Sequence, residues 1–419
     1  MKIERQGVFG TGGIALSLGD ANAVISRNVE MLPLKREAIR IRNLGPIKDV
    51  AIDDIKPFTV FIGESAGGKS AIMKVVVLFR WLFKRYNLHA NLETAGILLS
   101  PLHFDTDKQF KYVGLSGLIS EATEIQYSVT FEGDPQPFHI KYLQKRLEKE
   151  GSIPAGGLSY SKLAYITETR SFLAFLLGTN RYRPDDDSLF DDMLDNFHRA
   201  VTVRNGLDID FLNIQFVSQS TSFGKKYEIA SLDKDTYQIG FNDSSSGIQN
   251  AVPILLLASY FAKDFDLTER LTQSLFTMVK DSGKLTDFRP ISETDTLPKR
   301  VFLHIEEPEL GLFPDVQYNL LNRLITLASS ETYNPIHFML TTHSPYILNH
   351  LNLLIKAHDT RNTHFTEGAS LNFDDIAAYH VTDGGIEDLK RIVGKRLIDT
   401  DILSDPINDT YDRFEELES

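Results

Sequence analysis

The feature that most constrains this sequence is a glycine-rich octapeptide, GESAGGKS, at residues 63–70. It follows a short apolar run at residues 58–62 and precedes a helical stretch at residues 69–85. Glycine adopts the backbone conformations of so tight a turn without strain, and such a loop wraps a phosphate with its N–H groups. The order of strand, glycine loop and helix predicts half of a βαβ unit, and therefore a parallel sheet.

The octapeptide predicts a site for ATP and Mg²⁺. Lys69 would reach the β- and γ-phosphates, and the Ser70 hydroxyl would bind Mg²⁺. The positive end of the following helix also favours phosphate. A purely structural glycine turn is the alternative, against which the flanking strand and helix argue. The predicted ATP-binding residues of this segment are Gly63, Glu64, Ser65, Ala66, Gly67, Gly68, Lys69, Ser70 and Ala71. Lys74, one turn further along, is interpreted as a surface residue.

Two adjacent carboxylates, Glu306 and Glu307, end a second apolar run at residues 301–305. Ligands of open α/β sheets bind at the C-terminal ends of the strands, so this position favours a functional pair over a merely solubilising one. We predict that Glu306 organises Mg²⁺ and that Glu307 polarises the water that attacks the γ-phosphate. His343 follows the next apolar run, at residues 336–340, whose strand we expect to neighbour the first. We predict that it senses the γ-phosphate, and a structural histidine is the alternative.

A serine-rich loop, SSSGIQ at residues 244–249, precedes an apolar helical run at residues 251–261. Serine hydroxyls and a helix N-terminus hold phosphate in many proteins, which makes Ser245 and Gly247 candidate ATP-binding residues. An ordinary helix cap is the alternative. Two phosphate-binding helix starts would serve one nucleotide only when brought together, most simply across a dimer.

Composition and charge restrict the classes of protein further. The chain is 42% hydrophobic and 24% charged, as ordinary globular proteins are. It has no cysteine, which excludes disulfides and thiolate metal sites and fits a reducing cytoplasm. No apolar run reaches the roughly 18 residues of a membrane span, so we expect no membrane partner. A net charge of −13 gives no overall attraction to nucleic acid, although a local basic groove stays open.

The pattern of apolar runs predicts an α/β fold, with a mixed, mostly parallel sheet flanked by helices and a compact helical insertion. We divide the chain into an N-terminal extension (1–36), a phosphate-loop half (37–86), an insertion (87–240), a half that carries the serine loop, acids and histidine (241–350), and a C-terminal strand with an acidic tail (351–419). Further predicted elements are a strand at 162–166, a helix at 187–203, a hairpin at 227–239, a strand at 376–381 and a helix at 409–417.

In this order, the motifs resemble the ABC-type ATPase heads of the SMC, RecF and OLD proteins. Residues 306–309 (EEPE), with Leu312 and Pro314, resemble the Walker B and D-loop of OLD-like members. Residues 342–345 (THSP) resemble the switch-histidine motif, residues 244–248 the Leu-Ser-Gly-Gly-Gln motif, and residues 165–170 (YITETR) a Tyr-Ile-Pro-Ala-Glu-Arg-like element. The sequence departs from the family pattern at Ala71, Glu306, Ser246, Ile248 and Phe313, and its candidates for the Q-loop glutamine are Gln109 and Gln126.

The likeness is greatest to stand-alone ATPase subunits of bacterial anti-phage systems, the AriA-type subunit of PARIS first and the PtuA-type subunit of Septu second. It implies an ATP- and Mg²⁺-dependent ATPase, slow or regulated, that forms a homodimer or higher oligomer through its nucleotide sites. It also implies control of a separate effector, a toprim-like or HNH nuclease, and leaves room for a phage protein as trigger. A RecF-like repair ATPase acting directly on DNA, and a nucleotide-gated structural protein that scarcely hydrolyses ATP, stay open as alternatives.

Overall fold

The structure of the protein is a computed structural model. It describes residues 33–134, 136–179, 188–222, 224–233, 237–284, 297–330, 332–392, 394–401 and 405–418. Of the predicted N-terminal extension, residues 1–32 lie outside the described residues.

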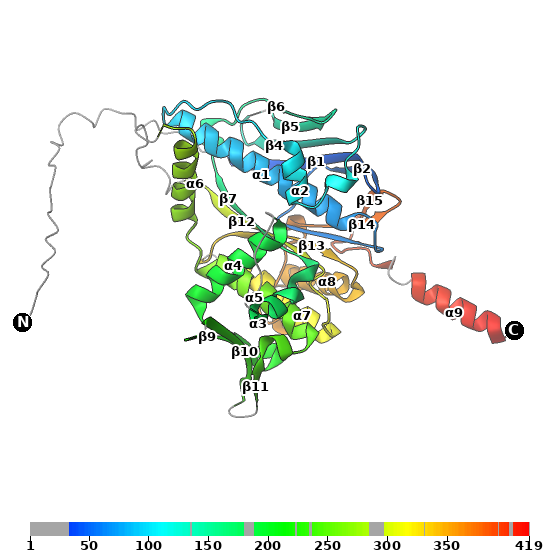
Figure 1. The fold of residues 1–419 in the computed structure, drawn as a ribbon. Helices are drawn as coiled ribbons and strands as arrows, with labels where there is room; N and C mark the ends of the chain where they lie inside the picture. The colour runs from blue at the N-terminus through cyan, green and yellow to red at the C-terminus, as the bar shows by residue number, and fades with distance from the viewer. Residues whose placement is uncertain are drawn as a thin grey trace, which may run out of the picture.

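A six-stranded sheet in the order β15-β14-β3-β13-β12-β7 forms the centre of the molecule (Figure 1). All of its strand pairs are parallel except β14–β15. The strands are β3 (Phe58–Gly63), β7 (Tyr160–Ile166), β12 (Lys299–Glu306), β13 (Ile336–Thr342), β14 (Ile376–Thr382) and β15 (Gly385–Asp388). The predicted α/β fold with a mixed, mostly parallel sheet is therefore confirmed, and β12 and β13 are neighbours as expected.

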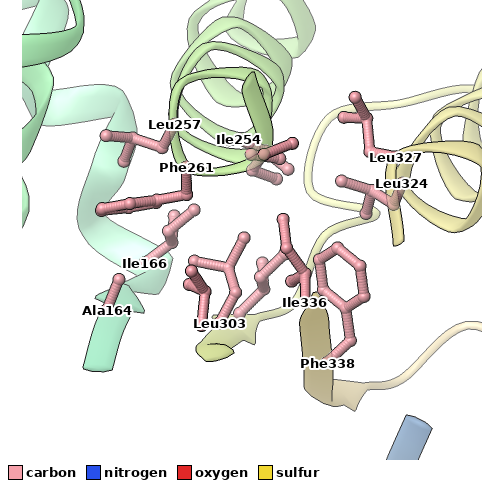
Figure 2. Close-up of a cluster of buried hydrophobic side chains, with 14 of the residues drawn as sticks. Ala164, Ile166, Ile254, Leu257, Phe261, Leu303, Leu324, Leu327, Ile336 and Phe338 are labelled. Atoms are coloured by element: carbon pink, nitrogen blue, oxygen red, sulfur yellow. The ribbon is translucent and has the colours of Figure 1, made fainter. Parts of the chain in front are cut away.

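One face of this sheet packs on helices that follow β7, the serine loop, β12 and β13 in the chain. Side chains two residues apart, such as Phe58, Val60 and Ile62, point to this face, as the period of a strand requires. Leu303 and Phe338 pack there against Ile254 of a covering helix (Figure 2). The helices are α3 (Phe172–Thr179), α4 (Leu189–Arg204), α5 (Ser246–Lys263), α6 (Leu267–Asp281), α7 (Pro314–Ala328) and α8 (Pro345–Thr360).

The opposite face packs on α1 (Lys69–Thr94), the helix that begins at the phosphate loop. A five-stranded antiparallel sheet, in the order β2-β1-β4-β5-β6, covers the other side of α1. Its strands are β1 (Leu34–Leu44), β2 (Ile47–Ile52), β4 (Glu124–Phe131), β5 (Phe138–Leu143) and β6 (Arg146–Glu150). Because α1 lies between two sheets, its buried residues surround it rather than form one stripe.

The insertion at residues 87–240 differs from the compact helical one that we expected. It supplies β4, β5, β6 and β7, and all four strands of a small sheet in the order β11-β10-β9-β8. That sheet comprises β8 (Gly206–Ile209), β9 (Ile214–Thr221), β10 (Gly224–Ser231) and β11 (Gln238–Gly240). The signal for β4 was present: Ile125, Tyr127 and Val129 alternate with more exposed residues, which is the period of a half-buried strand.

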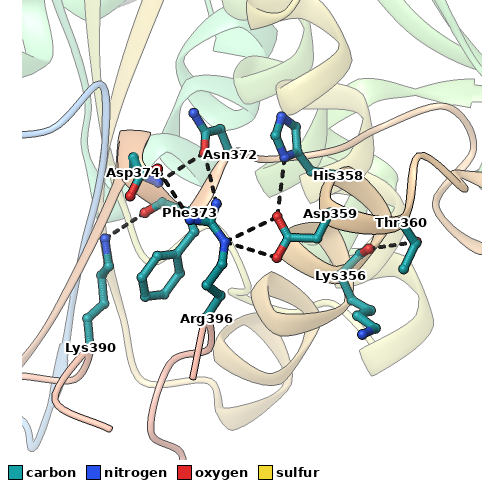
Figure 3. A network of polar contacts seen from close by, with 9 residues as sticks. All are labelled: Lys356, His358, Asp359, Thr360, Asn372, Phe373, Asp374, Lys390 and Arg396. Carbon is teal, nitrogen blue, oxygen red and sulfur yellow. Dashed lines mark hydrogen bonds and ion pairs between the residues drawn. The ribbon is translucent and has the colours of Figure 1, made fainter. Parts of the chain in front are cut away.

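The strand predicted at residues 376–381 is observed as β14, which pairs with β3 inside the central sheet. A polar network holds the next residues against the end of α8 (Figure 3). Arg396 contacts Asp359 at 3.1 Å and Asp374 at 3.3 Å, and the Lys390 ammonium donates to the Phe373 carbonyl. The acidic helix α9 (Asp405–Glu418) then extends away from the body (Figure 1). Within the described residues, no helix is long and apolar enough to cross a bilayer.

Candidate functional site

Four strand ends bring the predicted residues to one edge of the central sheet. Strands β3, β13, β12 and β7 are consecutive and parallel, so their C-terminal ends share that edge. The phosphate loop follows β3, and His343 follows β13. Glu306 ends β12, and the turn η3 (Glu168–Ser171) follows β7. Polar groups at the carboxyl ends of parallel strands are where open α/β sheets bind their ligands.

The phosphate loop has the backbone of a tight turn. Gly68 has a φ of 106° and Ala66 a φ of 62°, both in the left-handed region. A side chain at Gly63 would place its Cβ 2.3 Å from the Val381 carbonyl oxygen, so only glycine fits there. Gly68 is the N-cap of α1, and no side chain caps this helix start. The first N–H groups of α1 therefore have no side-chain acceptor, and an uncapped helix start of this kind suits a phosphate.

Lys69 is folded back into this loop. Its ammonium donates to the carbonyls of Gly63 at 2.9 Å and Glu64 at 2.7 Å. Burial lowers the pKa of Lys69, and the nearby carboxylates of Glu307 and Glu309 act in the opposite direction. The loop, the helix start and this lysine together fit the triphosphate of ATP.

The two predicted acids differ in their surroundings. Glu306 is buried at 2% exposure, and its carboxylate accepts from the Glu168 N–H at 3.1 Å. The Lys74 ammonium lies 3.7 Å from the same carboxylate, with the Lys74 side chain only 26% exposed. The interpretation of Lys74 as a surface residue is therefore wrong, because α1 directs it towards the acid that ends β12.

Glu307 lies against the predicted sensor. Its Oε1 is 3.2 Å from His343 Nε2, and its N–H donates to the Thr341 carbonyl at 2.8 Å. Glu307 has a φ of 42°, which is uncommon for a residue other than glycine and marks a backbone held by its surroundings. The structure thus brings together the residue predicted to polarise water and the residue predicted to sense the γ-phosphate.

The predicted magnesium residues are a carboxylate and a hydroxyl, Glu306 and Ser70. Among the described residues, no group of three or more His, Cys, Asp or Glu side chains could hold a metal ion by itself. Mg²⁺ commonly keeps several waters and takes one or two protein oxygens together with substrate phosphates. Glu306 and Ser70 therefore suit a metal that binds together with ATP.

Within one chain, the glycines of the serine loop and of the phosphate loop contact different residues. Ser245 is the N-cap of α5, and its side chain accepts from the Ile248 N–H at 3.5 Å. Gly247 packs on the segment after the acids, since a Cβ there would lie 2.6 Å from the Gly311 carbonyl oxygen. The glycines of the phosphate loop have other neighbours, Val381 and residues 46–47. Helix capping is thus observed, and phosphate binding by Ser245 and Gly247 stays a prediction. Gln109 lies in α2 (Thr106–Tyr112), and Gln126 lies in β4 of the antiparallel sheet.

Two contacts of the site were not predicted. Glu309 Oε1 accepts from the His343 N–H at 2.6 Å, so the third acid of EEPE fixes the backbone of the histidine. Arg170 of η3 donates to the carbonyls of both Glu306 and Glu307, at 2.6 Å each. The signal for Arg170 was its place just after a predicted strand, but the neighbour of that strand was unknown.

Orphaned polar atoms gather at the same place. Four buried side-chain atoms among the described residues meet no partner at good hydrogen-bond geometry: Tyr165 Oη, Asn250 Oδ1, Glu309 Oε2 and Thr341 Oγ1. The Tyr165 and Glu309 side chains still interact with Glu306 and Thr342, respectively. Thr341 pairs in register with Glu306. Arg170 donates to the carbonyl of Asn250 as well as to those of both acids. Unsatisfied buried groups are rare in native proteins and call for an explanation, such as a catalytic role or a bound ion or water. Their concentration here supports the assignment of this edge as the functional site.

Residues 178–348 match the AAA ATPase domain family. The matched segment includes the serine loop, the acid pair and His343, and it begins after the phosphate loop. The match implies ATP binding and indicates ATP hydrolysis. No curated protein matches this chain.

The fold also has similarity to solved ATPase structures. The SMC head domain from Thermotoga maritima aligns with a TM-score of 0.34 at 10% identity, over 84% of this chain and 97% of that one. The recombination mediator protein RecF with ATP aligns with a TM-score of 0.34 at 10% identity, over 84% of this chain and 99% of that one. The SMC head bound to the C-winged helix domain of ScpA aligns with a TM-score of 0.35 at 14% identity, over 84% of this chain and 95% of that one. Scores this low carry no conclusion about activity.

Proposed function

We propose that this chain is an ABC-type ATPase that hydrolyses ATP slowly or under regulation, with Glu307 as the residue that polarises the attacking water. The contact that carries the proposal is the 3.2 Å approach of Glu307 to His343, at adjacent strand ends and within electrostatic reach of Lys69. The proposal also rests on the phosphate loop and on the match to an ATPase family.

Each residue of the edge has a distinct part in this proposal. The loop N–H groups and Lys69 would hold the phosphates in place, which supplies the positioning that phosphoryl transfer chiefly requires. Glu307 would accept a hydrogen bond from the water, and His343, fixed by Glu309, would hold the Glu307 carboxylate in its orientation. Glu306 and Ser70 would hold Mg²⁺, which neutralises phosphate charge when it is bound.

The test of hydrolysis is Glu307→Gln. Glutamine keeps the size and the hydrogen bonding of the side chain but cannot act as a base, so we expect ATP binding to persist and turnover to fall by about 100-fold or more. Phosphate release and equilibrium ATP binding would be measured with wild type, Glu307→Gln and the exposed control Glu148→Gln. A wild-type rate in Glu307→Gln would refute this assignment of the base.

We further propose that the nucleotide state of the chain controls a separate effector protein in an anti-phage defence complex. The support is the resemblance of the motif series to ATPase subunits of such systems. Within one chain, Gly247 and the glycines of the phosphate loop have different neighbours, which is consistent with an oligomer in which the serine loop of one copy meets the phosphate loop of another. An effector that prefers one nucleotide state would be coupled to ATP by typically 1–3 kcal/mol.

The test of control is purification of this chain with the product of its neighbouring gene. Wild type, Lys69→Ala and Glu307→Gln would be compared by size-exclusion chromatography with mass measurement. We expect a complex that retains or releases the effector according to nucleotide state. A chain that binds no neighbour in any state and binds or cuts DNA directly would favour the RecF-like alternative.

A further inference from the structure

Arg170 is the largest side chain in the described residues that is fully buried, with 0% exposure. Its guanidinium makes four hydrogen bonds, all to backbone carbonyls. Nη1 donates to Glu306 at 2.6 Å and to Thr167 at 3.1 Å, and Nη2 donates to Glu307 at 2.6 Å. Nε donates to the carbonyl of Asn250, in α5, at 3.2 Å. One side chain therefore joins the helix of the serine loop to the backbone of both acids.

We propose that Arg170 is a positioning residue that couples α5, and with it the serine loop, to the backbone that orients Glu306 and Glu307. The inference rests on the proposed ATPase function and adds a means of regulation to it. A displacement of the serine loop, such as contact with a second copy would produce, is transmitted through α5 to the acid that polarises water.

The acid side of this link depends on a conformation that needs support. Glu307 has a left-handed backbone, and such a conformation persists in a residue other than glycine only where its surroundings fix it. Three hydrogen bonds hold it here: its N–H donates to Thr341, and its carbonyl accepts from Arg170 at 2.6 Å and from the Leu310 N–H at 3.1 Å. The turn η3, which carries Arg170, also binds the Glu306 carboxylate through the Glu168 N–H. Removal of the guanidinium releases the shorter of the two bonds to the Glu307 carbonyl and leaves the longer one from Leu310.

The helix side of the link begins at the serine loop. Asn250 Nδ2 donates to the Ser246 carbonyl at 2.9 Å, and the Asn250 carbonyl accepts from Arg170. Pro253 lies within α5 and has no N–H for the carbonyl of residue 249, which loosens the helix next to Asn250. Hydrogen bonds therefore run from Ser246 through Asn250 and Arg170 to Glu307.

The charge of Arg170 is retained in this buried position. Burial lowers the pKa of Arg170 to about 10, and nearby carboxylates act in the opposite direction; they are those of Glu309, Glu306, Glu307 and Glu168. A buried cation without compensation is strongly unfavourable, whereas this one is balanced by acids that it does not contact directly. All four of its hydrogen bonds therefore orient backbone carbonyls and none goes to a carboxylate.

The test separates the positive charge of Arg170 from the several N–H donors of its planar guanidinium. Lysine keeps the charge, but one ammonium cannot span the carbonyls of Glu306, Glu307 and Asn250. For Arg170→Lys we expect kcat for ATP hydrolysis to fall at least tenfold while the Kd for ATP changes less than threefold. Methylguanidinium, and not methylammonium, should restore part of kcat in Arg170→Ala. Arg80→Lys is the matched control, since Arg80 is also buried and bonds through its fork, to Glu37.

Asn250→Ala keeps Arg170 intact and serves as the second variant, with an expected loss of several-fold in kcat at unchanged ATP affinity. Wild-type kcat in Arg170→Lys or in Asn250→Ala would overturn the coupling. So would equal losses of kcat and melting temperature in Arg170→Lys and Arg80→Lys, because these would show a purely structural role. Absence of ATP hydrolysis in the wild type would instead contradict the proposed function on which the coupling rests.

Discussion

His304, two residues before Glu306, is buried in a polar network that links three elements. Arg80 of α1 forms a two-pronged ion pair with Glu37 of β1, at 2.7 and 2.8 Å, and also contacts His304 Nε2 at 3.0 Å. Because a guanidinium only donates, Nε2 must accept, and the proton lies on Nδ1, which donates to the Ala164 carbonyl at 3.0 Å. Burial, together with Arg80, lowers the pKa of His304 to about 3.

This network predicts a loss of stability in acid. The pKa of His304 in the folded chain, about 3, lies below the ordinary value of 6.5, so the unfolded chain binds the proton more readily. The free energy of unfolding should therefore fall as the pH falls from about 6.5 towards 3. In urea titrations between pH 4 and pH 7, His304→Gln should reduce the slope of this free energy with pH. An unchanged slope would show that His304 does not titrate on unfolding.

At pH 7 we expect the free energy of unfolding of His304→Gln to be about 1–3 kcal/mol lower than that of wild type, because Arg80 or Ala164 loses a hydrogen-bond partner.

At the scale of elements, the sequence predicted best where a motif fixes the end of a strand. Strands β3, β12 and β13 were recognised because their apolar runs stop at a glycine loop, an acid pair and Thr342–His343. Runs buried on both faces are typical of a parallel sheet, so their adjacency at one edge followed from the fold class. This was sufficient to place Lys69, Glu307 and His343 together.

What the sequence could not supply is the order of the strands. Apolar runs do not specify which strand lies beside β12, and β7 takes that place only in the folded sheet. The contacts of Arg170 with Glu306 and Glu307 depend on this pairing, so the role of Arg170 was out of reach. The sequence likewise does not specify that β14 lies beside β3, where the Val381 carbonyl approaches Gly63 closely. The antiparallel sheet is a different case, because the alternation in β4 is itself a strand signal in the sequence.

At the scale of the whole molecule, α1 is the element that connects the layers. It begins at the phosphate loop, passes between the antiparallel and central sheets, and carries Lys74 towards Glu306 and Arg80 towards His304. The serine loop is linked to the acids by two contacts. Gly247 packs on Gly311, and Arg170 donates to the Asn250 carbonyl of α5. The proposed oligomer would bring the serine loop of one copy to the phosphate loop of another.

The central claim is that residues 63–71 bind ATP, and calorimetric titration of MgATP tests it most directly. Wild type should bind with a stoichiometry of about one per chain. Lys69→Ala should bind at least about 100-fold more weakly, since loss of a charge-assisted contact to phosphate removes about 3 kcal/mol. Lys145→Ala, a change of an exposed lysine in the β5–β6 hairpin, should bind as wild type does. Equal affinity of wild type and Lys69→Ala would contradict the assignment of the phosphate loop.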